Sequence, residues 1–212
     1  MDDLDIRPLT ADLWDSFAGW FGSRDASSDS RWCWCAYWRK RGLSWSNSTA
    51  DDNRSVLRDL VPASPDASLA PGLVALRGER PVGWVSLGPR ESFDRLEHAQ
   101  LLARVDDKPV WSIVCFVVAR SERGRGIATA LLKAAVEYAR DQGATLVESY
   151  PVDAAEGRIP AASAYTGAAT MFERAGFEVV ATRRWNAKTR PRRIMRRAIA
   201  RPRRTAPGPA DG

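Results

Sequence analysis

The sequence predicts an α/β fold, and a long central strand followed by a glycine-rich turn is the main reason. Val110 to Val118 is a run of mostly β-branched and aromatic residues, which is typical of a fully buried strand. The turn after it leads into an amphipathic helix at about residues 126–141, which ends before Gly143. Strands and helices then follow one another in a mixed order.

Two helices are expected near the N-terminus. Thr10 is a candidate cap for the first, which ends near Gly22. The second spans about residues 49–61 and is stopped by Pro62 and Pro65.

The remaining elements follow from short apolar runs and turn residues. We expect a hairpin of residues 73–77 and 81–87, a polar loop at 88–108, strands at 145–150, 177–182 and 192–199, and a helix at 165–175.

Length and composition limit the class of protein. With 212 residues, 44% of them hydrophobic, we expect one domain over residues 1–200 and a disordered basic, proline-rich tail over 201–212. No apolar stretch is long enough for a membrane helix and the start is acidic, so we expect a cytoplasmic protein. Three cysteines and one histidine argue against a disulfide framework or a zinc site.

The net charge of +6 is a C-terminal feature. Residues 183–204 contain eleven basic residues and no acidic one, so the rest of the chain is slightly acidic. This basic segment could bind nucleic acid. The favoured interpretation is a terminal strand with charged edges followed by a solubilising tail.

The turn Arg123 to Ala128 has the features of a phosphate site. Amides at a helix N-terminus and the helix dipole favour an anion, Gly124 and Gly126 allow close approach, and Arg123 and Arg125 add charge. A Walker A loop is excluded because no Lys-Ser/Thr pair follows. A Rossmann turn with Glu148 as its ribose acid stays open as an alternative.

The stretch Val117 to Leu132 resembles the main acetyl-CoA motif of the GNAT acetyltransferase superfamily. That motif is a glutamine or arginine, two residues, Gly, one residue, and Gly or Ala; its first position falls on Ser121 and does not match. Residues 82–88 and 168–177 resemble the flanking strand and closing helix, so the resemblance spans about residues 70–182. It leaves the N-terminal helices and aromatic loop (1–62) outside.

The resemblance implies a GNAT fold, with a mixed, mostly antiparallel central sheet that splays between its fourth and fifth strands and is flanked by helices. It also implies that acetyl-CoA is bound through backbone groups of Phe116, Val117 and Val118. The amides of Arg123, Gly124, Arg125, Gly126, Ile127 and Ala128 would hold its pyrophosphate.

An acceptor amine must lose a proton to attack, and the leaving thiolate must gain one. Glu148 is the first candidate base, with Asp153 as the alternative; an ordinary salt bridge is the competing interpretation of Glu148. In many members of the superfamily, a tyrosine at the position of Phe172 protonates the leaving thiolate. Here Tyr165 is the candidate acid, with Tyr150 or water as alternatives.

The resemblance also implies that the N-terminal helices and the loop between them (residues 1–62), here called the N-terminal roof, cover the acceptor site. Trp34 and Trp38 of the aromatic segment 31–39, together with Trp84 and Arg90, are the candidate substrate contacts. A packed mini-strand of alternating Trp and Cys residues is the favoured interpretation for at least half of them.

The function that the sequence predicts is N-acetyl transfer from acetyl-CoA to a primary amine of a small molecule or protein. The alternative is a catalytically weak acyl-CoA-binding or nucleic-acid-associated module. We expect no membrane partner and no metal, and we leave a homodimer open.

Overall fold

A seven-stranded sheet forms the centre of the protein. The computed structural model describes residues 4–27, 29–152, 165–186 and 188–200. The strand order is β1-β2-β3-β4-β5-β7-β6, and all neighbours are antiparallel except β4 and β5, which run parallel. This confirms the mixed, mostly antiparallel sheet. The strands are β1 (Leu4–Pro8), β2 (Gly72–Arg77), β3 (Arg80–Pro89), β4 (Trp111–Val118), β5 (Leu146–Ser149), β6 (Glu178–Arg183) and β7 (Arg192–Ala198).

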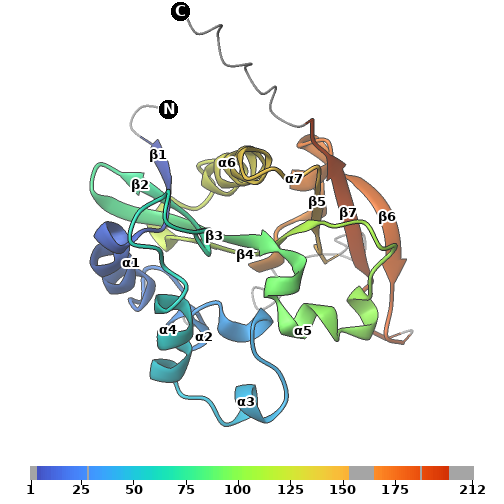
Figure 1. The fold of residues 1–212 in the computed structure, drawn as a ribbon, viewed down its shortest axis with the longest axis horizontal. Coiled ribbons are helices and arrows are strands. Elements are labelled where there is room, and N and C mark those ends of the chain that lie inside the picture. Colours follow the sequence, from blue (N-terminus) through green and yellow to red (C-terminus); the bar gives the residue numbers. More distant parts are fainter. Residues whose placement is uncertain (1–3, 28, 153–164, 187, 201–212) are drawn as a thin grey trace, which may run out of the picture.

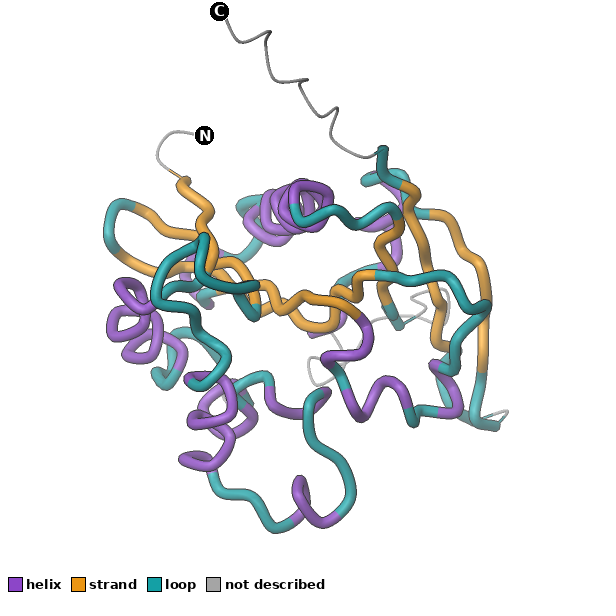
Figure 2. The backbone as a smooth tube through the Cα atoms, viewed as in Figure 1, coloured by secondary structure: helices purple, strands orange, loops and turns teal. Residues whose placement is uncertain are grey.

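Helices cover both faces of this sheet (Figures 1 and 2). The longest described helix, α6, packs on β2, β3 and β4, while α1 packs on β3 from the opposite face, together with the other N-terminal helices. The helices are α1 (Trp14–Phe21), α2 (Ser30–Cys33), α3 (Leu43–Ser46), α4 (Ala50–Arg58), α5 (Asp94–Glu97), α6 (Ile127–Asp141) and α7 (Ala169–Arg174). None of the helices in the described part of the chain has the length and apolar character that a membrane span requires.

The sheet opens between β4 and β5. Their pairing stops at Ile113 and Ser149, while β4 continues to Val118. A bulge lies at the same point: Ile113 is opposite Leu87 and Cys115 is opposite Ser86, which leaves Val114 as the extra residue. In Figure 1, β5, β7 and β6 stand at a marked angle to β2, β3 and β4. The expected splay between the fourth and fifth strands is therefore present.

The N-terminal third differs from expectation in two places. β1 was not predicted, although its side chains alternate between half-buried and exposed, as an edge strand requires. The aromatic segment is not a mini-strand: α2 is followed by Trp34 and Cys35 in the left-handed region and by a 3₁₀ turn at Ala36–Trp38.

Smaller differences concern helix ends and loops. α4 begins with a capping box between Thr49 and Asp52, whereas Thr10 makes no capping bond and donates instead to the side chain of Asp12. The expected polar loop at 88–108 contains α5 and two 3₁₀ turns. The predicted tail at 201–212 lies outside the described residues.

Candidate functional site

The glycine turn forms an open anion-binding loop at the start of α6. Gly124 and Gly126 have φ values of +77° and +81°, in the left-handed region that glycine adopts most easily. A Cβ at either position would meet no atom within 4 Å, so backbone conformation rather than crowding requires glycine. No side chain caps α6, and its first amides therefore point out unpaired by helical geometry. Amides of this kind, with the positive helix end, attract an anion such as phosphate.

A buried carboxylate holds this loop in place. Glu122 is 5% exposed, and it accepts hydrogen bonds from Arg80 at 2.8 Å, Arg77 at 3.2 Å and Arg125 at 3.5 Å. Burial alone would raise the pKa of Glu122, but the arginines, Arg77 foremost, outweigh burial and lower it. Arg125 is thus held by Glu122. The exposed Arg123 donates, within the described part of the chain, only to the carbonyl of Val118, at 3.3 Å.

The end of β4 beside this loop presents a free backbone edge. No strand of the described residues pairs with Phe116, Val117 and Val118 on the side of β5. The side chain of Phe116 packs against Phe172, with ring centroids 6.1 Å apart. A free edge of this kind can add an extended ligand through main-chain hydrogen bonds.

Tyr165 lies near the opening, whereas the side chain of Phe172 is not accessible there. Tyr165 makes a hydrogen bond with Arg192 and has Tyr37 and Cys115 as neighbours. Burial raises the pKa of Tyr165, and the nearby Arg192 only partly opposes this shift. Tyr165 therefore keeps its proton at neutral pH. The ring of Phe172, in contrast, is fully buried among apolar residues.

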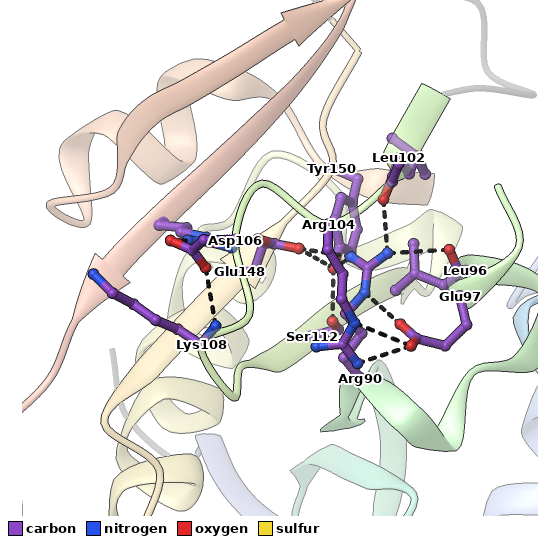
Figure 3. Close-up of polar contacts among 12 residues, drawn as sticks. Arg90, Leu96, Glu97, Leu102, Arg104, Asp106, Lys108, Ser112, Glu148 and Tyr150 are labelled. Carbon is purple, nitrogen blue, oxygen red and sulfur yellow. Dashed lines mark hydrogen bonds and ion pairs between the residues drawn. The ribbon is translucent and has the colours of Figure 1, made fainter. Parts of the chain in front are cut away.

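Glu148 is the centre of a buried ionic network (Figure 3). One carboxylate oxygen accepts from Arg90 at 2.8 Å and from Tyr150 at 2.6 Å, and the other accepts from Arg196 at 2.6 Å. The side chain is 1% exposed. A general base needs a lone pair that can reach the substrate's proton. These contacts instead favour a salt-bridged, positioning role for Glu148.

Arg90 was expected to contact the acceptor, and the structure buries it completely. Its guanidinium donates to Glu97 and Glu148 and to the carbonyls of Leu96 and Leu102. It joins the segment after β3 to β5 and has no exposed atom to offer a substrate. Arg90 is therefore a structural anchor in this conformation.

The three tryptophans predicted to line the acceptor site belong to the hydrophobic core instead. Trp34 and Trp38 are each 6% exposed and Trp84 is 0% exposed. Trp84 lies 4.9 Å from Phe17 between ring centroids, and Trp34 packs on Trp14. The interpretation of the aromatic segment as packed residues is the better one, although its conformation is helical.

Asp153, the alternative base, lies outside the described residues. Arg192, which lowers the pKa of Tyr165, was not singled out from the sequence as a site residue, because the contact is long-range. The described residues contain no group of three or more His, Cys, Asp or Glu side chains arranged to hold a metal ion.

The family model of the acetyltransferase (GNAT) family matches residues 23–177. The chain belongs to the GNAT acetyltransferase family. It is accordingly an acyltransferase, and the glycine loop and the open edge of β4 both fall within the matched region. A search of curated protein sequences finds no match.

Solved GNAT structures share this fold at low sequence identity. A GCN5-related N-acetyltransferase from Kribbella flavida is 16% identical, with a TM-score of 0.54 over 93% of this chain and 99% of that one. A polyamine N-acetyltransferase of Drosophila melanogaster, which forms N-acetylagmatine, is 14% identical with a TM-score of 0.57 (93% and 100% covered). The NatC complex bound to Gag peptide and CoA is 12% identical with a TM-score of 0.51 (93% and 99% covered).

Proposed function

We propose that this protein transfers an acetyl group from acetyl-CoA to a primary amine on a small molecule or protein. The observation that carries the proposal is the combination of two features at one place. The glycine loop at the start of α6 presents unpaired amides, and the adjacent end of β4 has no described partner strand on the side of β5.

These features fit the two chemical parts of coenzyme A. The amides of residues 123–128 and the exposed Arg123 suit the pyrophosphate, because both offer donors and positive charge to an anion. The backbone of Phe116, Val117 and Val118 suits the amide-containing pantetheine arm, which can add to a free strand edge. Acetyl-CoA supplies the activated acetyl thioester.

Tyr165 is the proposed proton donor. Its phenol remains protonated at neutral pH and is close enough to Cys115 of β4 for charge on that thiol to raise the pKa of Tyr165. Arg192, hydrogen-bonded to this phenol, can orient it and stabilise negative charge that develops there. This assignment explains how the chain can do without a tyrosine at position 172.

Glu148 serves in this proposal as a positioning residue. Three donors already occupy its carboxylate, so the proton of the amine leaves to water. Tyr150, buried and bonded to both Glu148 and Ser112, is held in the same network and is not a donor to substrate.

The proposal is tested by measuring CoA thiol release from acetyl-CoA with a panel of primary amines. The panel should include polyamines, amino acids and peptides with free N-termini. We expect amine-dependent release and an acetylated product detected by mass spectrometry. Binding of acetyl-CoA with no transfer to any amine would instead support the catalytically weak acyl-CoA-binding module.

A further inference from the structure

Two cysteines that are far apart in the sequence meet on one face of the sheet. In the register of β3 and β4, Ser86 lies opposite Cys115. A Cβ on Gly83 would collide with Ile127 and Leu131 of α6. Positions 84 and 86, and with them Cys115, therefore point away from α6, toward the N-terminal roof.

Cys35 belongs to the N-terminal roof and contacts the same face of the sheet. The indole nitrogen of Trp84 donates to Sγ of Cys35 at 3.2 Å, and the side chains of Cys35 and Cys115 are in hydrogen-bonding contact. Both residues are free thiols, 2% and 6% exposed. The pair thus joins the aromatic segment to β4 beside the opening of the sheet.

The backbone at this point is strained. Trp34 and Cys35 have φ values of +45° and +53° and are the only non-glycine residues with positive φ in the described ranges. Such conformations are unfavourable for L-residues and persist where surrounding packing enforces them. Here Trp34 packs on Trp14 and Phe21, and the reversal at residues 34–35 turns the Cys35 side chain toward the sheet.

The surroundings make the two thiols chemically different. The hydrogen bond from Cys115 lowers the pKa of Cys35 against the effect of burial, and Trp84 and Arg39 lower it further. The same contact and burial raise the pKa of Cys115. One sulfur is therefore the better nucleophile, and the other carries the proton.

Arg39 supports this asymmetry. Its guanidinium donates to the carbonyl of Ser92 at 3.2 Å and lies 4.5 Å above the ring of Phe93. It contacts no carboxylate among the described residues, and its Nε is buried without a hydrogen-bond partner. A half-buried cation with no acidic partner in the described part of the chain favours an anionic sulfur nearby.

We propose that Cys35 and Cys115 form a peroxide-sensitive dithiol, whose oxidation to a disulfide links the N-terminal roof covalently to β4. The Cys35 thiolate attacks hydrogen peroxide, which breaks the O–O bond and gives a Cys35 sulfenic acid and hydroxide. The Cys115 thiol then attacks that sulfur, the S–S bond forms, and the hydroxyl group leaves as water. Overall, two thiols are oxidised and one peroxide is reduced to two waters. Peroxide is small and uncharged, so local opening of the roof admits it.

The test compares the full-length wild type with Cys33→Ser, Cys35→Ser and Cys115→Ser. Each protein is treated with peroxide, denatured, alkylated with a maleimide and mapped without reduction. We expect the wild type and Cys33→Ser to lose two reactive thiols and to yield a peptide linking Cys35 to Cys115. In Cys115→Ser we expect a dimedone-trapped sulfenic acid at Cys35, and in Cys35→Ser a Cys115 that remains alkylatable.

Cys33 is the internal control, because burial raises the pKa of its thiol to about 12. Three alkylatable thiols after treatment, or a peptide linking Cys33 to Cys35, would overturn the proposal. If the other variants do not fold, the thiol counts and linked peptides of the wild type and Cys33→Ser are sufficient to test the proposal. The outcome does not depend on whether the protein transfers acetyl groups.

Discussion

Arg90 and Glu148 form an ion pair of 2.8 Å in which both side chains are 1% exposed. The pair connects the segment that follows β3 to β5, and it lies next to the parallel pairing of Ser112 with Glu148. Because both charges are removed from water, each depends on the other for compensation. The geometry of the β4–β5 opening is therefore coupled to this contact.

Replacing Arg90 by Met should destabilise the protein by about 3–5 kcal/mol, because Glu148 loses a buried cationic partner. The double variant Arg90→Met, Glu148→Leu should recover part of that loss. Urea unfolding measures both. The control is Arg7→Met, whose ion pair with Asp5 is 2.8 Å long but about half exposed on each side and should be worth about 0–1 kcal/mol. Equal effects of the two single variants would contradict a structural role for Arg90.

Glu122→Gln should make folding stability less sensitive to acid. The pKa of Glu122 is lowered in the folded protein, so its contribution is fully present above the unfolded pKa of about 4.3 and is lost as pH falls through the folded value. The difference in unfolding free energy between wild type and variant should shrink from about pH 6 to about pH 3. Urea unfolding at several pH values checks this, and a difference that stays constant would count against the arginine contacts.

Tyr165→Phe should lower kcat by about 10²–10⁴-fold, the usual contribution of a general acid, while acetyl-CoA affinity is unchanged. Because the pKa of Tyr165 is raised, ionisation of this phenol should not reduce the wild-type rate below about pH 10. Steady-state kinetics with an accepted amine measure both effects. Tyr138→Phe is the matched control, since this hydroxyl on α6 accepts from the Ala70 amide and its ring packs on Trp111. Wild-type turnover in Tyr165→Phe would remove it as the proton donor.

The elements closest to the glycine loop were predictable from the sequence for local reasons. β4 is a continuous apolar run, α6 has a helical period, and Gly124 and Gly126 have the positive φ that such a turn requires. The family motif is local as well. These three features suffice to predict the fold class and the position of the loop.

The buried contacts were not predictable, because they join residues far apart in the chain. Glu148 meets Arg90 and Arg196, which are 58 and 48 positions away, and no spacing rule relates them. The aromatic segment alternates like a strand, but packing around Trp34 and Cys35 imposes helical turns and positive φ values. Tertiary contacts override local propensity at these positions.

The central claim is that the glycine loop at the start of α6 binds acetyl-CoA, and calorimetric titration tests it most directly. Gly126→Trp would cover the loop, and Gly143→Trp at the other end of α6 is its matched control. The two glycines have φ values of +81° and +86°, and a Cβ added to either would meet no atom within 4 Å. We predict that wild type and Gly143→Trp bind acetyl-CoA and that Gly126→Trp does not. Absence of binding by the wild type, or equal binding by both variants, would contradict the assignment.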